Sequence, residues 1–374
     1  MKKILFILTN LAGGGAEKVL IDVLSQTDYS CYKVDLLLIV GEGVYLSSVP
    51  SAVQIHSLYK SRGFKYKLDF LLARYFGLEY FQRHLLKKKI VGRYDVVASF
   101  MEGIPLKFHK YLLSDAQRNI TWVHTDLCRL HYTSKYFKRR EELRLYNSMD
   151  AVVVVSNQAR EGFYKQFQVE VPLFTLYNPI NKTEIVSLAG KQNIATKKFT
   201  ICCVGRLTYA KRLDRALRVV DNLLKKGYEI ELWIVGCGQL EKQLLKLCND
   251  LGIKKNVSFL GFQSNPYPYI KAADIFLSTS MTEGYPLVIC EALCLDKPIV
   301  ATNVTGPREI LGDSEFGLLT EESDEAIFEG VRRMIDDKDL RQHYAEIASE
   351  RKQMFDIQST VDKIYKLINS DAND

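Results

Sequence analysis

One stretch in the C-terminal half of the chain constrains the fold more than any other. Two apolar runs, Asp274–Ser278 and Lys297–Thr302, flank a glycine-containing turn and a segment with helical character. Apolar runs of this length, bounded by turn residues, are typical of buried parallel strands. The order strand, turn, helix, strand predicts a βαβ unit of the kind that binds ligands at the carboxyl ends of its strands.

The turn and the helix start carry the chemistry of this unit. Pro286 suits a first helical turn, where its missing N–H costs nothing. The N–H groups of Leu287 and Val288 then point out of the helix start, where partial positive charge attracts a phosphate. Glu283 lies just before the helix and Glu291 more than a turn inside it, so their carboxylates can bind hydroxyls on either side of that phosphate. Hydroxyl, phosphate and hydroxyl together outline a nucleotide sugar. The whole segment reads Thr282-Glu283-Gly284-Tyr285-Pro286-Leu287-Val288-Ile289-Cys290-Glu291.

Short apolar strands alternate with helical patterns along the whole chain. This alternation predicts parallel sheets with helices on both faces, arranged as two Rossmann-like domains. The predicted strands are Ile4–Leu8, Val34–Val40, Val53–Leu58, Val96–Phe100, Asn119–Val123 and Ala151–Val155 in the first half, and Thr200–Val204, Glu231–Val235, Val257–Leu260, Ile275–Ser278 and Ile299–Ala301 in the second.

The joint between the domains is expected near Tyr177–Asn181, because Asn178-Pro179 favours a turn. We therefore expect an N-terminal domain over residues 1–178 and a C-terminal domain over residues 179–357. A last helix, at about 358–374, lies beyond the second sheet.

Composition indicates a globular protein, with 47% hydrophobic and 25% charged residues among 374. No apolar run is long enough for a transmembrane helix, and Asn10 and Gly13–Gly15 follow the first apolar run where a signal-peptide cleavage region should be. The eight cysteines show neither C-x-x-C pairs nor zinc spacing, which favours buried free thiols in the cytoplasm.

The segment 283–291 also resembles the Glu-x7-Glu motif of retaining GT-B glycosyltransferases of family 4. The resemblance covers essentially the whole chain and is strongest from about Thr200 to Gly312. It implies the GT-B fold, two Rossmann-like domains with a central interdomain cleft, in which the final helix returns to the first domain. Within the motif it implies a donor site that includes Glu283, Gly284, Tyr285, Leu287, Val288 and Glu291.

Two cationic residues follow a predicted strand and suit a diphosphate. Arg206 lies in Gly205-Arg206-Leu207, and Lys211 follows four residues later. A planar guanidinium and a point-charge ammonium complement phosphate oxygens. The family carries the same pattern, and the resemblance implies that Arg206 and Lys211 neutralise the leaving nucleoside diphosphate.

The first domain is expected to contribute a glycine loop and a histidine. Gly13-Gly14-Gly15-Ala16-Glu17 lacks the spacing of the G-x-G-x-x-G dinucleotide fingerprint. It resembles a Gly-Gly-Ala-Glu loop that faces the donor diphosphate in the family, which implicates Gly14 and Gly15. His124 follows a predicted strand, where side chains face the ligand crevice, and the family's histidine at this place contacts the donor sugar. His131, seven residues on, is a weaker candidate for the acceptor side.

The resemblance also implies that the main chain of Phe262, after Gly261, reads the edge of the base. We expect no metal ion or other cofactor. The only Asp-x-Asp is Asp337-Lys338-Asp339, which lies far from any predicted strand end, and Arg206 and Lys211 can offset the diphosphate charge instead.

The first half of the chain is the basic half, with 25 Lys and Arg against 16 Asp and Glu in residues 1–180. From Lys60 to Arg93 there are ten basic and two acidic residues, interleaved with aromatic ones. A second basic cluster is Lys138-Arg139-Arg140. The first segment is either a core-facing helix with a solvated basic face or a helix docked on an anionic membrane, and we favour the membrane. No nucleic-acid motif accompanies it.

The sequence therefore predicts a retaining glycosyltransferase that moves a hexose or N-acetylhexosamine from a nucleotide sugar, expected to be a UDP-sugar, to a saccharide acceptor. The resemblance to the family implies a lipid-linked acceptor, in bacterial polysaccharide or glycoconjugate synthesis. The enzyme is expected to lie on the inner face of the cell membrane. Alternatives on the same fold are a nucleotide-sugar epimerase, a phosphorylase, or a non-catalytic partner subunit.

Overall fold

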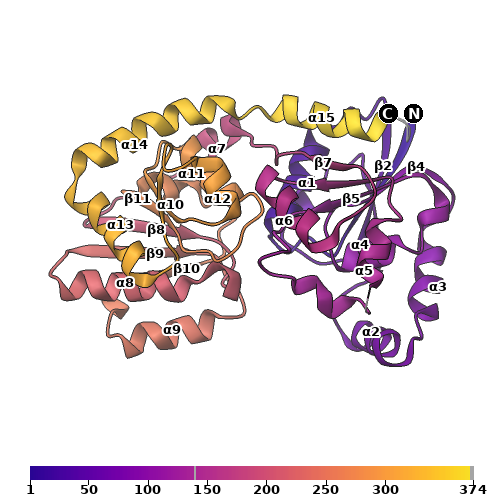
Figure 1. Cartoon of the computed structure of the whole chain (residues 1–374), viewed down its shortest axis with the longest axis horizontal. Coiled ribbons are helices and arrows are strands. Elements are labelled where there is room, and N and C mark those ends of the chain that lie inside the picture. The colour runs from indigo at the N-terminus through magenta and orange to yellow at the C-terminus, as the bar shows by residue number, and fades with distance from the viewer. Residues whose placement is uncertain (139, 371–374) are drawn as a thin grey trace. The chain divides into compact units, whose positions relative to one another are not determined.

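The computed structural model describes residues 1–138 and 140–370. Arg139, part of the second basic cluster, and residues 371–374, the end of the expected last helix, lie outside the described residues. The chain divides into two compact units, residues 1–179 with 358–374 and residues 180–357 (Figure 1).

The first unit is built on a seven-stranded sheet with the order β3-β2-β1-β4-β5-β6-β7. All of its paired strands are parallel. The strands are β1 (Lys2–Leu8), β2 (Tyr32–Val40), β3 (Gln54–Tyr59), β4 (Tyr94–Ser99), β5 (Ala116–Val123), β6 (Ala151–Val154) and β7 (Leu173–Thr175). The central strands are buried on both faces, which explains their continuous apolar runs.

Helices flank this sheet and join its strands. They are α1 (Gly15–Ser25), α2 (Phe64–Phe76), α3 (Tyr80–Lys89), α4 (Ile104–His109), α5 (Glu141–Tyr146), α6 (Asn157–Phe167) and the final α15 (Ile357–Asn369). Short 3₁₀ turns occupy Leu46–Ser48, Leu113–Asp115 and Tyr132–Tyr136.

The final helix packs on the first unit. The hydroxyls of Tyr365 and Thr27 lie 2.5 Å apart, and the ring centroids of Tyr365 and Tyr32 are separated by 4.6 Å. The ammonium of Lys2 donates to the carbonyl of Ile368 at 3.2 Å. These contacts attach α15 to the beginning of the chain, although the second unit separates the two in sequence.

The second unit contains a six-stranded sheet with the order β10-β9-β8-β11-β12-β13, again with parallel pairs. The strands are β8 (Phe199–Val204), β9 (Ile230–Val235), β10 (Val257–Gly261), β11 (Ile275–Ser278), β12 (Ile299–Thr302) and β13 (Leu318–Thr320). The helices are α7 (Lys182–Ala189), α8 (Leu213–Lys225), α9 (Glu241–Asp250), α10 (Tyr267–Ala272), α11 (Leu287–Cys294), α12 (Thr305–Leu311), α13 (Asp324–Asp336) and α14 (Lys338–Arg351), with 3₁₀ turns at Tyr209–Lys211, Lys254–Asn256 and Lys352–Met354.

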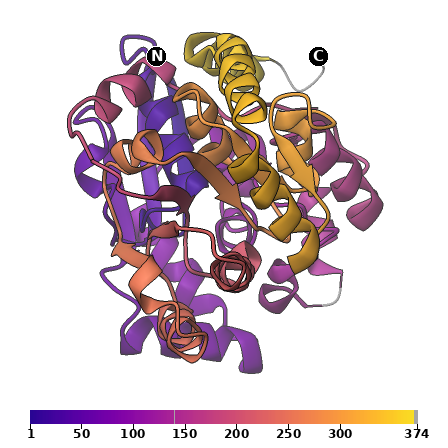
Figure 2. The ribbon, with the colours of Figure 1, turned by 90° about the vertical axis from the view of Figure 1, so that its left-hand side faces the viewer.

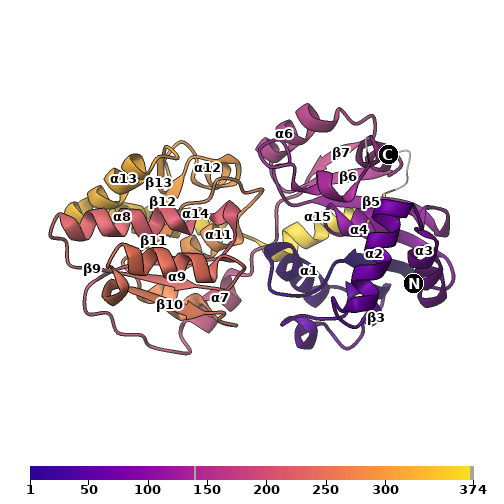
Figure 3. The ribbon, with the colours of Figure 1, turned by 90° about the horizontal axis from the view of Figure 1, so that it is seen from below.

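The core of the second unit explains why these segments form its helices. Helices α8, α9 and α13 bury apolar side chains in one cluster with β8, β9 and β11, whereas α10 contacts β8, and α11 contacts β11 and β12. Figures 1 and 3 label these helices and strands. The sheet thus has helices on both faces, seen from the side of this unit in Figure 2. The predicted class, two Rossmann-like α/β domains, is confirmed.

The cysteines differ in part from the expectation of buried thiols. Cys31, Cys128 and Cys237 are exposed, whereas the other five are buried; all eight are free. No helix in residues 1–138 and 140–370 combines the length and the apolar character that crossing a bilayer requires.

Candidate functional site

A pocket in the second unit opens where β8 and β11 end. These neighbouring strands lie at the point where the strand order reverses, because β8 pairs with β9 on one side and with β11 on the other. In doubly wound sheets, ligands bind at such a switch point. The pocket is lined by Cys203, Val204, Gly205, Lys211, Leu213, Leu277, Ser278, Thr279, Ser280 and Val288. Lys211 and Val288, two residues of the predicted donor site, therefore share one pocket.

Hydrogen bonds join the two loops that border this pocket. The hydroxyl of Thr279 donates to the carbonyls of Lys211 and Arg212, each at 3.0 Å. The N–H of Met281 donates to the carbonyl of Ala210 at 2.8 Å. The loop after β11 thereby fixes the main chain that carries Lys211.

Lys211 and Glu283 form an ion pair, although 72 residues separate them. The ammonium of Lys211 lies 2.5 Å from Oε1 of Glu283, and the hydroxyl of Ser280 donates to the same oxygen at 2.7 Å. Both side chains are only partly exposed, Lys211 by 23% and Glu283 by 14%. The structure thus brings together the predicted diphosphate-binding cation and the first predicted glutamate.

The second glutamate of the motif is buried in α11. Only 5% of Glu291 is exposed. Its Oε1 accepts a hydrogen bond from the hydroxyl of Tyr267 at 3.2 Å, and Tyr267 itself is 4% exposed. No local pattern in the sequence marks Tyr267, because it lies 24 positions before Glu291.

The start of α11 is held close to the next loop of the sheet. Helix α11 begins at Leu287, with Pro286 as its cap in extended conformation. A β-carbon added to Gly306 would lie 2.5 Å from Cδ of Pro286 and 2.9 Å from the carbonyl oxygen of Gly284. Glycine at position 306 therefore permits α12 to begin beside the Glu283–Pro286 turn.

Two further predicted residues of this unit are accessible. Arg206 is exposed, and its guanidinium has neither a hydrogen-bond nor an ion-pair partner in residues 1–138 and 140–370. Phe262 is 38% exposed and directly follows β10. Of the remaining predicted residues, Gly284 is buried and Tyr285 is half-buried. Asp337 caps α14, where its carboxylate accepts the N–H of Leu340 at 2.8 Å.

In the first unit, the glycine loop has a partner of its own. Helix α1 begins at Gly15, after Gly14 as its cap. The Glu17 carboxylate accepts the N–H groups of Gly13 at 2.6 Å and of Gly14 at 2.7 Å, and Glu17 is 3% exposed. The N–H of Gly14 is thus already bonded to a carboxylate of the protein.

His124 directly follows β5, as the strand pattern predicted. Its main-chain N–H donates to the buried carboxylate of Glu102 at 2.9 Å, and the hydroxyl of Tyr132 donates to the other Glu102 oxygen at 2.8 Å. Both ring nitrogens of His124 are buried and have no hydrogen-bond partner among the described residues. Burial lowers the pKa of this imidazole to about 4, against the opposing effect of the Glu102 charge. The ring is therefore neutral at pH 7.

The ring of His131 is less available to bind an acceptor than the ring of His124 is to bind a ligand. Its Nε2 lies 2.7 Å from the buried carboxylate of Glu142, and its Nδ1 lies 3.1 Å from the amide of Gln166. Both ring nitrogens thus have partners within the first unit.

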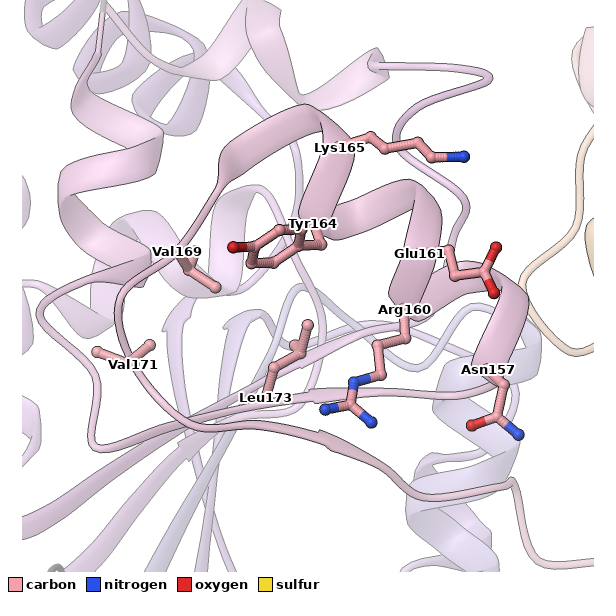
Figure 4. A pocket seen from close by; sticks show the side chains of 8 residues that line it. All are labelled: Asn157, Arg160, Glu161, Tyr164, Lys165, Val169, Val171 and Leu173. Carbon is pink, nitrogen blue, oxygen red and sulfur yellow. The ribbon is translucent and has the colours of Figure 1, made fainter.

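Another hollow in the first unit contains none of the predicted residues. It lies between α6 and the segment that leads into β7, with Tyr164 and Leu173 turned toward it (Figure 4). Its lining is mixed, with the charges of Arg160, Glu161 and Lys165 around apolar side chains. This composition does not indicate one class of ligand.

The basic segment folds as two helices rather than one. Gly77, in left-handed conformation with φ 69°, ends α2, and α3 starts at Tyr80. Large apolar side chains on this pair stay exposed: Phe64, Leu68, Leu71, Tyr75, Phe76, Leu78, Tyr80 and Phe81. Exposed cations lie among them: Lys65, Lys67, Arg74, Arg83, Lys88 and Lys89. Lys87, by contrast, is paired with Asp115. A helix packed only on the core does not leave so many aromatic rings in water.

Comparisons with known proteins show what this chain is similar to. Residues 187–351 match the family described as "Glycosyl transferases group 1". A Campylobacter jejuni N-acetylgalactosamine-N,N'-diacetylbacillosaminyl-diphospho-undecaprenol 4-alpha-N-acetylgalactosaminyltransferase is 33% identical over 215 residues, 57% of this chain; the match spans only 58% of that enzyme.

Two other relatives align over nearly the full length. The C. jejuni GalNAc-alpha-(1->4)-GalNAc-alpha-(1->3)-diNAcBac-PP-undecaprenol alpha-1,4-N-acetyl-D-galactosaminyltransferase is 26% identical over 98% of both chains. The crystal structure of Anabaena HepE in complex with UDP and glucose superposes with a TM-score of 0.76 at 21% identity, over 99% of this chain and 100% of that one. The fold is the GT-B fold of such glycosyltransferases.

Proposed function

We propose that this chain transfers a sugar from a nucleotide-sugar donor to a saccharide acceptor, and the match of residues 187–351 to the glycosyl transferases group 1 family supports this. The observation that carries the proposal is the pocket at the ends of β8 and β11. Lys211 and the start of α11, at Val288, line this pocket together. A cation and a helix N-terminus at a sheet switch point form an environment suited to a diphosphate.

The side chains around this pocket bind different parts of the donor. Lys211 and Arg206 offset the charge that grows on the diphosphate as the bond from the anomeric carbon to the phosphate oxygen breaks. Glu283, beside Lys211, binds sugar hydroxyls, and Glu291 binds the ribose. The acceptor hydroxyl oxygen bonds to the anomeric carbon on the face that the phosphate oxygen leaves, and its proton passes to the departing diphosphate, which makes the enzyme retaining.

The neutral imidazole of His124 is proposed to contact the donor sugar. With both nitrogens buried and unpartnered among the described residues, the ring can donate one hydrogen bond and accept another. The main chain of Phe262 is proposed to read the base, and Gly15, at the start of α1, to lie at the diphosphate. For Gly14 we retain a role in shaping the loop, since its N–H is bonded to Glu17.

We propose a UDP-sugar as the donor, with a hexose or N-acetylhexosamine as the group transferred, and a lipid-linked saccharide as the acceptor. The names of two relatives support the transferred N-acetylhexosamine and the lipid-linked acceptor, since each is an N-acetylgalactosaminyltransferase acting on an undecaprenol-linked saccharide. The HepE structure, which contains UDP and glucose, supports the UDP-sugar. The reaction is proposed to need no metal ion, because two protein cations are available for the diphosphate. Transfer should then survive a chelator, and loss with chelator followed by rescue with a divalent ion would contradict this part.

A panel of nucleotide sugars in a thermal-shift assay tests the proposal first. A donor present at 100 times its dissociation constant adds about 2.7 kcal/mol to the free energy of unfolding, so UDP-sugars should raise the melting temperature. Transfer from the best donor to an undecaprenol-linked saccharide should then give a product with the donor's anomeric configuration by NMR.

The rival activities give different results in the same assays. An epimerase converts the donor without an acceptor, and a phosphorylase needs inorganic phosphate. A non-catalytic partner binds the donor and releases nothing. Absence of any nucleotide-dependent shift would contradict the proposed function altogether.

We also propose that the enzyme works at the inner face of the cell membrane, bound through α2 and α3. Exposed aromatic side chains suit the interfacial region of a bilayer, and each nearby Lys or Arg adds about 1 kcal/mol on anionic lipid. The exposed rings of Phe76, Tyr80 and Phe81 support this assignment, because they surround the bend between the two helices.

Sedimentation with vesicles of phosphatidylglycerol and phosphatidylcholine tests the membrane surface. The wild-type protein should bind anionic vesicles, and replacing Phe76, Tyr80 and Phe81 by serine should reduce binding at least tenfold. Tyr164→Ser is the matched control, because Tyr164 is an equally exposed aromatic residue, at 56%, on α6. Lys88→Gln/Lys89→Gln should weaken binding, whereas Lys87→Gln should act less, since Lys87 is paired with Asp115. Equal binding to neutral and anionic vesicles, or none, would contradict the assignment.

A further inference from the structure

A buried tyrosine hydroxyl lies on the glutamate that is proposed to bind the ribose. Tyr267 is the first residue of α10, and its hydroxyl donates to Oε1 of Glu291 on α11 at 3.2 Å. The exposed fractions of the two residues are 4% and 5%. A hydrogen bond to a carboxylate is about twice as strong as one between neutral groups, and water competes little for it at this depth.

The main chain around Tyr267 is fixed as well. The side-chain oxygen of Asn265 accepts the N–H of Tyr267 at 3.3 Å. The amide of the same Asn265 donates to the carbonyl of Leu188 on α7 at 2.9 Å. Helix α10 contacts both α7 and α11. Tyr267 therefore contacts α11 from a segment that is also hydrogen-bonded to α7.

The carboxylate of Glu291 needs such an anchor to hold one orientation. The last torsion of a glutamate is broad, so its carboxylate turns easily unless a partner holds it. Two hydroxyls on a ribose require a carboxylate of defined orientation, since hydrogen bonds weaken steeply away from linearity.

We infer that Tyr267 is a positioning residue for the nucleotide: it holds the Glu291 carboxylate in the orientation that receives the ribose hydroxyls. The inference rests on the proposed function, in which Glu291 binds the ribose. Tyr267 acts through Glu291 and does not touch the reacting atoms. It should therefore affect the affinity for the donor and leave the chemical step alone.

The alternative is that Tyr267 has only a packing role between α10 and α11. Tyr267→Phe separates the two, because it keeps the ring and removes only the hydroxyl. Tyr269→Phe is the matched control from the same helix: Tyr269 is half-buried, and its ring packs at 6.1 Å from Trp233. Melting temperatures of both variants show whether the fold is kept.

Calorimetric titration with uridine diphosphate measures the effect. Tyr267→Phe should bind uridine diphosphate about tenfold more weakly, the change expected for one lost charge-assisted hydrogen bond, whereas Tyr269→Phe should bind as the wild type does. With a UDP-sugar that supports transfer, KM should rise by a similar factor and kcat should change less than twofold.

A second ligand shows whether the effect runs through the ribose. With 2',3'-dideoxyuridine diphosphate, which lacks both ribose hydroxyls, Tyr267→Phe should bind as well as the wild type. In a Glu291→Gln background, the Tyr267→Phe change should likewise cost less than twofold with uridine diphosphate. Each comparison is made within one variant or one background, so a partial loss of stability does not mimic it.

The possible failures are distinguishable. If the wild type binds no uridine diphosphate, or Glu291→Gln leaves that affinity unchanged, the proposed role of Glu291 fails and this inference fails with it. If Glu291→Gln weakens binding while Tyr267→Phe does not, only the inference about Tyr267 is overturned. Equal losses for uridine diphosphate and its dideoxy analogue would also overturn it, since Tyr267 would then act on the fold rather than through the ribose.

Discussion

Two helix starts in this molecule look alike in sequence and differ in structure. Both α1 and α11 follow a buried strand and a glycine-containing turn, and both were predicted to attract an anion. At α1, the Glu17 carboxylate accepts the N–H groups of Gly13 and Gly14. At α11, the first turn borders a pocket that also contains Lys211. The N–H groups of Gly13 and Gly14 are therefore already bonded to a carboxylate of the protein, whereas the first turn of α11 lies beside a cation.

The largest expected effect is the loss of turnover on replacing the two cations proposed to bind the diphosphate. Arg206→Ala and Lys211→Ala should each lower turnover about 100- to 1000-fold, because they stabilise charge that appears in the transition state. Steady-state kinetics with a saturating donor measures this effect. Arg218→Ala is the control, since this partly exposed arginine on α8 pairs with Asp214. Near-normal turnover in both site variants would place the catalytic charges elsewhere.

His124 should contribute to a different measurement, the acid stability of the first unit. Its pKa is lowered to about 4 by burial, so between about pH 6.5 and 4 the unfolded chain binds a proton that the folded chain does not. Stability should therefore fall as the pH falls through this window, by an amount on the order of 3 kcal/mol from this group.

Denaturant unfolding from pH 7 to 4 measures this dependence. His124→Phe should flatten it, whereas His343→Gln, a change at an exposed histidine, should not. His109, whose pKa is also about 4 because of burial, should leave a remaining slope in both variants. An unchanged slope in His124→Phe would mean that the His124 imidazole takes up its proton at the same pH in the folded and the unfolded chain.

A change at Glu17 tests whether the starts of α1 and α11 differ in their role. Glu17→Ala leaves two N–H groups without their acceptor and should lower the free energy of unfolding by about 1–3 kcal/mol. Its effect on uridine diphosphate affinity should stay within about twofold, since the Glu17 carboxylate bonds to its own loop and has no proposed contact with the ligand. Glu161→Ala, at an exposed glutamate on α6, provides the control for stability. A large loss of affinity without a loss of stability would make Glu17 part of the donor site.

A change at Gly306 tests whether nucleotide binding depends on the position of the start of α11. Gly306→Ala should weaken nucleotide binding several-fold, because the added carbon would lie 2.5 Å from Pro286 and displace the start of α11. Gly190→Ala is the control, since its added carbon would meet nothing closer than 3.5 Å. Titration with uridine diphosphate compares the two variants. Equal affinities would show that the position of Pro286 does not matter for the ligand.

The sequence was sufficient for most of the fold, and physical reasons explain the exceptions. All of the predicted strands exist, because buried parallel strands leave continuous apolar runs. The missed strands, β7 and β13, have three residues each and lie at sheet edges, where a short, partly exposed run has no clear pattern. The basic segment from Lys60 to Arg93 was expected to form one helix, but left-handed Gly77 divides it.

For the site, local patterns were readable and long-range pairs were not. The Glu283–Glu291 segment, Arg206 and Lys211 each belong to a strand-end motif, and the structure gives them strand-end positions. The Lys211–Glu283 ion pair and the Tyr267–Glu291 hydrogen bond join segments far apart in sequence, and only the sheet order determines them. Glu17 was visible in the glycine motif, yet its return to its own helix start depends on rotamer and burial.

A crystal structure of the whole chain with uridine diphosphate tests the central claim most directly. We expect the diphosphate at the ends of β8 and β11, with oxygens within hydrogen-bond distance of the N–H groups at the start of α11 and of the ammonium of Lys211. We also expect the ribose hydroxyls on Glu291, with the Glu17 carboxylate still on Gly13 and Gly14. A diphosphate that displaces Glu17 from α1, or one bound away from Lys211 and α11, would contradict that claim.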